Sequence, residues 1–475
     1  MRDDRLENWY LNLSDFQAFD DIKSLDLTDN SIAGFVENKG NVRFSWQRKL
    51  EGLVLSDNQL TNDIISFLSG FHHLKSLDLS YNELEGSLDI SEFGDLEKLE
   101  HLELDGSFNI GNKFFESIGA LTSLKVLSLS SCGIKGSLPI AGWIKLKKLE
   151  EFDISNNELE GQLGLSFINM TSLRKLDFSN NSFTGNFASS LATLTSLIFL
   201  AISLNKFPGN FPNWLLENNT KIVSLDLGNC SFTGHFRLPS HVNPYLGTII
   251  ASYNMIIGQL PSNISTIFPN LEHLEMSANA MNGSLPPLFG QNLWTLDLSD
   301  NNFSGEMPRN ISVHVSLLEI LKLSNNKLVG SVCPTLVNLK ILRELFLDGN
   351  SFSSSIPSCL FNASFLLVMD ISNNHFVGKL PNDGIRNLSN LQALSIARNH
   401  LEGSISTEII EQRSLKYLDL SRNDLSESIP SFAHSKVRYV LLNNNRFSGF
   451  ATTMFNRSLP LIMLDLSNNN ITGKI

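Results

Sequence analysis

Residues 74–86 read Leu-Lys-Ser-Leu-Asp-Leu-Ser-Tyr-Asn-Glu-Leu-Glu-Gly, and this phrase decides the fold because it returns nineteen times along the 475 residues. Each copy has a short leucine pattern, then a marker residue that is nearly always Asn, then a hydrophobic residue and usually a Gly. Successive markers are 22 to 28 residues apart, and most are 24 or 25 apart. The sequence is therefore one structural unit repeated end to end. The markers are placed at Asn30, Asn58, Asn82, Asn109, Cys132, Asn157, Asn181, Asn205, Cys230, Asn254, Asn279, Asn301, Asn326, Asn350, Asn374, Asn399, Asn423, Asn445 and Asn469.

The repeat length and the leucine spacing together predict a solenoid. A period of roughly 20–29 residues is the signature of leucine-rich repeats. Leu77 and Leu79 are two residues apart, so in a strand both side chains point to the same side. One copy cannot bury these side chains, but stacked neighbours bury them in a continuous core. We expect an α/β solenoid, a right-handed leucine-rich-repeat superhelix with a parallel sheet on its concave side, over residues 1–475 as a single domain of about 19 repeats.

The marker Asn has a separate structural role. At the end of each strand the backbone turns inside the solenoid, where its N–H and C=O groups do not reach water. An Asn amide offers both a donor and an acceptor to such a turn. Stacked Asn side chains therefore predict a ladder that satisfies groups which would otherwise cost about 1–3 kcal/mol each. Cys132 and Cys230 occupy the same position, where a small buried thiol replaces the amide.

Composition excludes several functions. The formal net charge of −12 and the pI of about 5.3 argue against a nucleic-acid partner, because no basic stripe is present to neutralise phosphates. The glycines recur once per repeat and serve turns, so no phosphate-binding loop is indicated. His72 and His73 have no nucleophile at a recognisable elbow. We expect neither an enzyme nor a metal or organic cofactor.

The two ends of the chain carry a further expectation. The start, Met1 to Arg5, is charged and no apolar stretch follows it, and no run of 18 or more apolar residues occurs. The last residues, 471–475, stop partway through a repeat, and neither end shows a polar or cysteine-bearing cap. We therefore expect a piece of a larger protein, truncated at its C-terminus, with membrane anchoring only through a segment absent from this chain.

The tail of the repeat points to a family. It has the form of a hydrophobic residue, any residue, Gly, any residue, then Leu, Ile or Met before Pro, and it occurs at 134–139, 281–286, 303–308 and 376–381. This form resembles the plant-type extracellular leucine-rich repeat, and the chain is similar over nearly all its length to the ectodomain of plant receptor-like proteins. The resemblance implies a single-pass plasma-membrane receptor without a kinase domain, facing the extracellular side. It also implies a peptide or protein signal in defence or development, and a leucine-rich-repeat receptor kinase as co-receptor. Two alternatives stay open, a soluble apoplastic inhibitor of cell-wall-degrading enzymes and the ectodomain of a leucine-rich-repeat receptor kinase.

Sequons of the form Asn-x-Ser/Thr fit a secreted, glycosylated surface. The repeat is itself rich in Asn, Ser and Thr, so the sequons support secretion less than the repeat tail does. Our candidate glycosylation sites are Asn12, Asn169, Asn218, Asn263, Asn310, Asn362, Asn387 and Asn456.

Candidate ligand contacts are sought on the strands. Three outward positions lie two, four and six residues before each marker, and together they cover the concave sheet. The position four back is Asp in nine repeats, which we interpret as a solubilising background that would favour a basic ligand. Bulky or charged exceptions form two runs, and exposed aromatic and Arg residues are the types that anchor interfaces. The first run includes Ala201, Leu204 and Ile250, and the second includes Glu344. The predicted ligand-binding residues are Phe199, Tyr253, His273, Glu275, Lys322, Phe346, Arg398, Tyr417, Arg422 and Tyr439.

Overall fold

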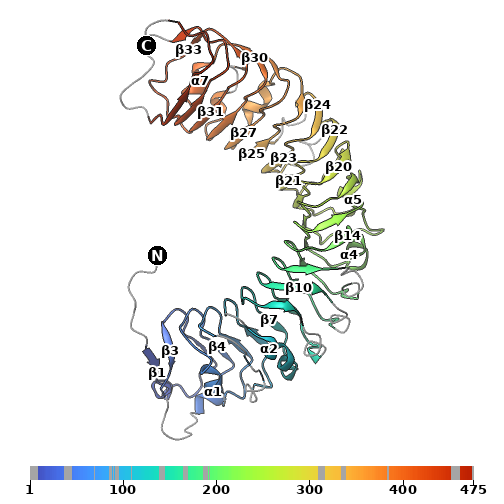
Figure 1. The fold of residues 1–475 in the computed structure, drawn as a ribbon, viewed down its shortest axis with the longest axis vertical. Helices are drawn as coiled ribbons and strands as arrows, with labels where there is room; N and C mark the ends of the chain where they lie inside the picture. The colour runs from blue at the N-terminus through green and yellow to red at the C-terminus, as the bar shows by residue number, and fades with distance from the viewer. Residues whose placement is uncertain are drawn as a thin grey trace. The chain divides into compact units, whose positions relative to one another are not determined.

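The computed structural model describes residues 9–36, 45–68, 70–84, 88, 90, 96–107, 110–138, 145–163, 170–185, 191, 193–308, 316–332, 339–381, 385–450 and 460–472. The chain divides into two compact units, Met1–Phe232 and Thr233–Ile475. Each unit is a stack of similar coils, and each coil contributes one short strand to a main sheet (Figure 1). The expectation of a single domain stays a prediction.

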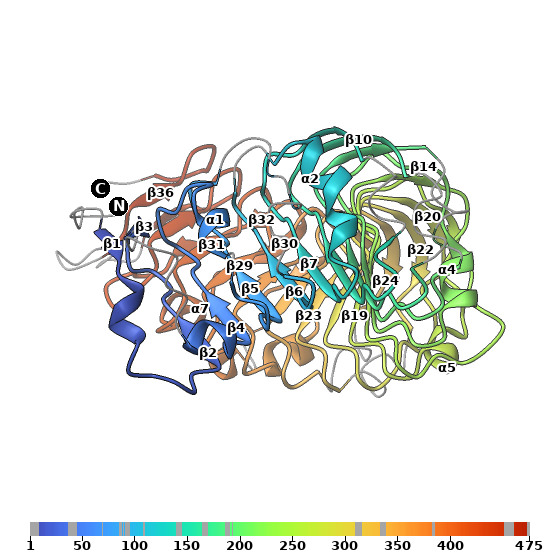
Figure 2. The ribbon, with the colours of Figure 1, turned by 90° about the horizontal axis from the view of Figure 1, so that it is seen from below.

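The main sheet of each unit is parallel, and each strand pairs in register with the strand of the next coil. Leu53 lies opposite Leu77, and Leu77 opposite Leu102, so the inward leucines of neighbouring coils stack directly. Figure 2 shows β4 to β7 of the first unit side by side. In the first unit the main-sheet strands are β2 (Ser24–Asp26), β4 (Gly52–Val54), β5 (Ser76–Asp78), β6 (His101–Glu103), β7 (Val126–Ser128), β9 (Glu151–Asp153), β11 (Lys175–Asp177), β13 (Phe199–Ala201) and β15 (Ser224–Asp226). In the second unit they are β17 (Thr248–Ile250), β19 (His273–Glu275), β21 (Thr295–Asp297), β23 (Ile320–Lys322), β25 (Glu344–Phe346), β27 (Val368–Asp370), β29 (Ala393–Ser395), β31 (Tyr417–Asp419), β34 (Tyr439–Leu441) and β36 (Met463–Asp465).

A second layer of short strands follows the marker residues. In the second unit of Figure 1, β20, β22 and β24 lie on the opposite side of the stack from β21, β23 and β25. The first unit's second-layer strands are β1 (Trp9–Leu11), β3 (Ile32–Phe35), β8 (Lys135–Ser137), β10 (Glu158–Gln162), β12 (Ser182–Thr184), β14 (Pro208–Asn210) and β16 (Ser231–Thr233). The second unit's are β18 (Ile257–Gln259), β20 (Ala280–Gly283), β22 (Asn302–Glu306), β24 (Lys327–Gly330), β26 (Ser351–Phe352), β28 (Val377–Lys379), β30 (His400–Gly403), β32 (Asp424–Leu425), β33 (Ser428–Ile429) and β35 (Gly449–Phe450).

Short helices complete many coils before the chain returns to the main sheet. Their brevity fits a coil of about 24 residues, in which two strands and two turns use most of the chain. They are η1 (Leu13–Phe16), η2 (Ser45–Arg48), α1 (Ile64–Leu68), α2 (Asn112–Ser117), η4 (Ile118–Ala120), α4 (Asn213–Asn218), α5 (Ile264–Ile267), η7 (Ser358–Asn362), η8 (Ile385–Asn387) and α7 (Thr407–Ile410).

The core and the Asn ladder are as the sequence predicts. Leu77, Leu79, Leu298 and Leu420 are fully buried. Asn82 shows the recurring ladder pattern: its Oδ1 accepts from the Leu60 N–H at 3.0 Å, and its Nδ2 donates to carbonyls of its own turn and of the preceding coil at 2.9–3.2 Å. Each ladder Asn therefore ties two coils together.

The two ladder cysteines behave as buried hydrogen-bond donors. The Cys132 thiol donates to the Leu104 carbonyl at 3.2 Å, and the Cys230 thiol donates to the Ile202 carbonyl at 3.3 Å. Burial raises the pKa of each thiol to about 12. The thiolate is the reactive form of cysteine, so these two side chains are structural rather than nucleophilic.

The predicted ladder position Asn109 is wrong. Strand β6 ends at Glu103, and the residue before the ladder position is Gly106, with φ +69°, so the fully buried Ser107 occupies the slot. The physical reason is the fixed distance of three residues from the buried Leu104, the same as from Leu79 to Asn82. Asn109 lies outside the described residues. The expected irregularity between Leu104 and Asn109 is thus present.

The second expected irregularity, from His235 to Thr248, is also present. No helix lies between β16 and β17, all of which the structure describes. A tight turn takes the place of the helix, in which the fully buried Asn243 accepts from the Tyr245 N–H at 2.9 Å and donates its own N–H to the Ile267 carbonyl.

Candidate ligand-binding surface

The outward face of the main sheet is shaped by the Asp residues four positions before the ladder. In each case a carboxylate oxygen accepts the backbone N–H two residues further on, at 2.9–3.0 Å, which closes the turn at the end of the strand. The nine residues are Asp26, Asp78, Asp153, Asp177, Asp226, Asp297, Asp370, Asp419 and Asp465. Their interpretation as a solubilising background was incomplete, because they are turn residues first. The missed signal is the Ser, Thr or Gly that follows each Asp by two positions.

The position two residues before the ladder does not face solvent as expected. Ser80, Ser155, Ser203 and Ser421 are all buried there. The chain has already begun to turn inward at this point, beyond the last strand residue. The exposed sheet face therefore consists mainly of the positions four and six residues before the ladder.

Carboxylates gather on the sheet face of the first unit. Burial raises the pKa of Glu103, and the neighbouring Asp78 and Asp105 raise it further. Burial likewise raises the pKa of Asp105 and of Asp177, although Ser and backbone donors oppose the shift. A cationic ligand on this face would relieve the repulsion among these groups.

The predicted contact residues belong to two structural positions rather than one. Tyr253, Arg398, Arg422 and Leu204 sit directly before the ladder residue with φ between +54° and +58°. These four lie on the turn that follows the strand, so the expectation that all the candidates share strand register is wrong for them. The left-handed turn backbone directs them to the strand-end edge of the sheet, where Tyr253 is 66% exposed and Leu204 is 47% exposed.

Three predicted residues of the second unit come together on β23 and β25. Lys322 lies beside Phe346 in register, with its Nζ 5.5 Å from the ring centroid. The same ammonium is 3.4 Å from a carboxylate oxygen of Glu344. Each of these side chains is half-buried. The cation is satisfied within the sheet face, which leaves less charge for a ligand.

A second group lies on β31, β34 and the adjoining turns. Tyr417 and Tyr439 are opposite each other in register on neighbouring strands. Tyr439 is 39% exposed, while the half-buried Tyr417 has a raised pKa because of burial and the nearby Asp419. Arg398 and Arg422 occupy equivalent turn positions of consecutive coils, and both are exposed. Two tyrosines and two arginines within adjacent coils are the composition of an interface anchor.

The remaining candidates are separate from these groups. His273 and Glu275 lie half-buried on β19, and Ile250 on β17 pairs in register with Glu275. In the first unit, Lys175 lies 5.9 Å from the ring centroid of Phe199.

Ala201 was expected to face outward, but it is buried. It lies in register between Asp177 and Asp226, and its methyl group is too short to reach solvent.

The side of the stack where the chain enters the main strands was not predicted as a surface of interest. Tyr245, Trp294 and Leu317 are exposed there in the second unit, seven or nine residues before the ladder. No single repeat distinguishes these positions, and only a comparison of the same offset in every repeat would have found them.

Among the predicted glycosylation sites, Asn218, Asn263 and Asn387 are exposed beside α4, α5 and η8, away from the main-sheet strands. Asn12 is half-buried, and its Oδ1 accepts from the Ser14 N–H at 3.1 Å. Asn169, Asn310, Asn456 and the Asn362 side chain lie outside the described residues. Glycosylation at all eight stays a prediction.

Comparison with known proteins agrees with this architecture. A family profile described as "Leucine-rich repeat region" matches residues 55–285, and one described as "Leucine Rich Repeat" matches 292–313, 342–363 and 414–435. Receptor-like protein 9a of Arabidopsis thaliana is 35% identical over 172 residues, which are 36% of this chain and 18% of that protein. Receptor-like protein 14 of the same plant is 30% identical over 269 residues, 56% of this chain and 27% of that protein. The matches thus span about a quarter or less of these relatives' own length.

Solved structures show the same fold. The ectodomain of the Arabidopsis receptor kinase GASSHO1/SCHENGEN3, in complex with CASPARIAN STRIP INTEGRITY FACTOR 2, has a TM-score of 0.82 and 30% identity, covering 95% of this chain and 56% of that one. The Arabidopsis receptor kinase HAESA, in complex with the peptide hormone IDA and the co-receptor SERK1, has a TM-score of 0.76 and 27% identity, covering 98% and 81%. In the part of this chain that the structure describes, no helix has the length and apolar character to cross a membrane.

Proposed function

Because the chain is a leucine-rich-repeat protein whose relatives are plant receptor-like proteins, we propose that it is the extracellular recognition module of a plant cell-surface receptor. In this proposal it binds a peptide or protein signal on the sheet face and acts through a partner receptor kinase. The printed complexes of the structural neighbours support both parts, since one contains a peptide hormone and a co-receptor. The curated relatives favour a kinase-lacking receptor over a receptor kinase.

The observation that carries the binding site is the group on β31 and β34. Tyr417 and Tyr439 present two rings on adjacent strands, and Arg398 and Arg422 extend the group to the strand-end edge. Aromatic and Arg side chains dominate the energetics of interfaces. Asp370 and Asp419 on the same face add negative charge, so a ligand segment with a basic residue beside an apolar one fits best.

A displayed peptide library tests this assignment. Peptides enriched on the chain are measured against Tyr439→Ala, Arg422→Ala and the control Lys379→Ala, whose exposed side chain lies on β28 in the other layer. We expect each of the first two substitutions to weaken binding about tenfold or more, the scale of an interface hot spot. Lys379→Ala should leave binding unchanged. Equal affinity for all variants, or a loss confined to Lys379→Ala, would refute the assignment.

The co-receptor is tested separately. An enriched peptide should increase the association of the chain with a leucine-rich-repeat receptor kinase ectodomain, measured by analytical ultracentrifugation. The Tyr439→Ala variant should show no such increase. Association that is independent of peptide would contradict signal-dependent assembly.

A further inference from the structure

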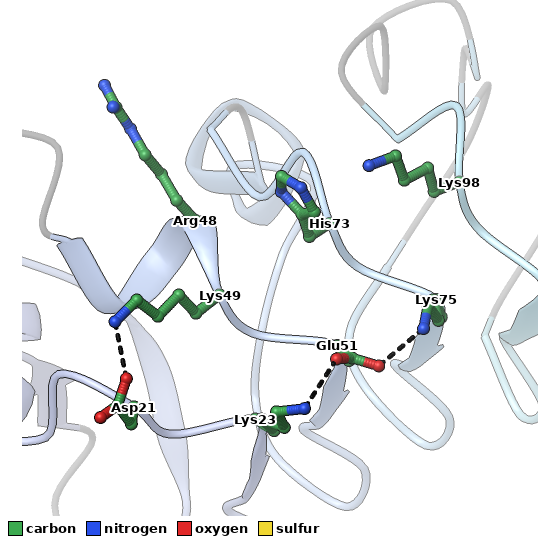
Figure 3. Close-up of a pocket in the computed structure, with 8 residues that line it drawn as sticks. All are labelled: Asp21, Lys23, Arg48, Lys49, Glu51, His73, Lys75 and Lys98. Atoms are coloured by element: carbon green, nitrogen blue, oxygen red, sulfur yellow. Dashed lines mark hydrogen bonds and ion pairs between the residues drawn. The ribbon is translucent and has the colours of Figure 1, made fainter.

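A basic depression of about 650 Å³ lies in the first unit, at the edge where the chain enters strands β2, β4 and β5 (Figure 3). It is lined by Asp21, Lys23, Arg48, Lys49, Glu51, His73, Lys75 and Lys98. Five of these side chains are Lys or Arg and two are carboxylates, a formal excess of three positive charges with His73 neutral. The whole chain carries −12, so this depression opposes the general charge of the molecule.

One row of the lining neutralises itself. Glu51 lies between two lysines, 3.4 Å from the Lys23 ammonium and 2.7 Å from that of Lys75. Lys49 bonds Asp21 at 2.6 Å. The lysine partners lower the pKa of both carboxylates. These bonds hold the lysine side chains in place, which reduces the conformational entropy that a ligand would have to remove.

The other row has no such compensation. Arg48, His73 and Lys98 form no ion pair with any residue that the structure describes, and in Figure 3 no dashed line reaches them. They come from three consecutive coils, so the row advances by about 4.8 Å per coil, the spacing of neighbouring strands. In the next coil the position of Lys98 is taken by Ser123, where the row ends.

We propose that this depression is a docking site for a short acidic segment of a partner protein. The site is separate from the sheet face and does not depend on the ligand proposed there. Arg48, His73 and Lys98 meet the carboxylates of the segment, while the paired lysines below them supply the surrounding positive potential. Solubility does not require such a patch, because the rest of the chain is already strongly acidic.

The dimensions favour a peptide over a long polyanion. Three coils span about 10 Å, which is the length of about three extended residues. A long polyanion would continue beyond Ser123 over a chain of net charge −12 and be repelled there. Asp21 and Glu51 would also repel a uniformly charged polymer, whereas a peptide can place backbone N–H groups or a basic residue beside them.

A comparable edge of the second unit must be distinguished in any test. Arg413, Lys416, Lys436 and Arg438 line a smaller depression of about 370 Å³. In that depression the Lys416 ammonium bonds the neutral Gln392 at 2.9 Å, and no carboxylate lines it. We assign the acidic segment to the first depression because it is larger and its lysines are fixed by carboxylates.

The experiment measures binding of a fluorescein-labelled pentapeptide of Asp and Glu to the full chain by fluorescence anisotropy. The test variant is Arg48→Gln/His73→Gln/Lys98→Gln. The matched control is Lys113→Gln/Lys135→Gln/Lys206→Gln, which removes three exposed cations elsewhere in the same unit. A third variant, Arg413→Gln/Lys436→Gln, tests the second depression. A neutral Asn and Gln pentapeptide and an oligouronate of similar length are the comparison probes.

We expect the test variant to weaken binding of the acidic pentapeptide by at least about fivefold, since one exposed ion pair contributes about two- to fivefold. The control variant and Arg413→Gln/Lys436→Gln should bind within twofold of the wild type, and higher ionic strength should weaken all binding. Equal losses in the test and control variants, or loss only in Arg413→Gln/Lys436→Gln, would overturn the assignment. Tighter binding of the oligouronate would overturn the choice of a peptide. Tyr439→Ala should not change pentapeptide binding, which separates this result from the test of the sheet face.

Discussion

The ladder residue Asn326 gives the sharpest test of the fold, because every hydrogen bond of its amide is defined. Its Oδ1 accepts from the Phe303 N–H at 2.9 Å, and its Nδ2 donates to the carbonyls of Leu298, Leu323 and Ser324 at 3.0–3.1 Å. Substitution Asn326→Ala removes all four contacts while leaving the leucine core intact.

The magnitude follows from what each partner has left. The Leu298 carbonyl keeps Asn301 Nδ2 at 3.3 Å, Leu323 keeps Asn350 Nδ2 at 2.8 Å, and Ser324 keeps a backbone N–H at 2.9 Å. The Phe303 N–H is then the one group of the four without a partner, and it is fully buried with its residue. An orphaned buried donor costs about 1–3 kcal/mol, and the weakened carbonyls add to this, so we expect about 2–3 kcal/mol of destabilisation.

The control is Asn325→Gly. Asn325 is the exposed neighbour with φ +53°, and its amide makes one contact, to an Asp300 carboxylate oxygen at 2.9 Å. Glycine tolerates this left-handed conformation, whereas Ala would add strain of about 1–2 kcal/mol and confuse the comparison. We expect Asn325→Gly to change the free energy of unfolding by less than about 0.5 kcal/mol.

The assay is native-state hydrogen exchange with urea unfolding as a second readout, because a solenoid can open locally. The Phe303 amide should exchange roughly 30- to 100-fold faster in Asn326→Ala, the ratio that corresponds to about 2–3 kcal/mol. Equal exchange rates in Asn326→Ala and Asn325→Gly would refute the ladder register. A similar urea midpoint for both variants would refute the energetic reasoning.

Three other predictions follow from single positions. Ser107→Asn should raise the free energy of unfolding by about 1 kcal/mol, because no described residue accepts from the buried Leu84 N–H and an Asn at 107 would supply the ladder acceptor; a lower urea midpoint would contradict this. Burial raises the pKa of Glu103, so its contribution to stability is present below its unfolded pKa and is lost as pH rises through the folded value; Glu103→Gln should therefore stabilise by up to about 0.5 kcal/mol at pH 7 and by less near pH 4, and the opposite trend in urea midpoints would be inconsistent with it. The Leu464 amide should exchange faster than the Leu296 amide, because Leu464 is half-buried while Leu296 is fully buried, and equal protection would show that β36 is as stable as the interior strands.

Much of the fold could be predicted because the repeat makes it a local problem. The leucine two positions from its neighbour and the Asn three positions after the second leucine are set by one strand and one turn, and stacking copies this geometry. The Asn109 error arose where the marker was chosen by residue type instead of by its distance from Leu104. Counting three residues from that leucine gives Ser107.

The candidate surface was less predictable, because it depends on contacts between residues about 24 positions apart. That Tyr417 and Tyr439 share register could be inferred from the repeat, but the satisfaction of Lys322 by Glu344 and Phe346 depends on side-chain conformations across two strands. The turn position of Arg422 required the backbone angle, since an offset of one residue from the ladder does not announce a left-handed turn.

The charge distribution shows why net charge alone misjudges the partners of this chain. A total of −12 suggests a basic partner, and the carboxylates around Glu103 on the sheet face agree with it. Yet the edge of the same unit carries Arg48, His73 and Lys98 without acidic partners among the described residues. Opposite charges on two surfaces of one unit allow a basic ligand and an acidic partner segment to bind at once without competing. In a stack of coils each offset in the repeat forms its own surface, so partners are better inferred by comparing the same offset in successive repeats than from the composition of the whole.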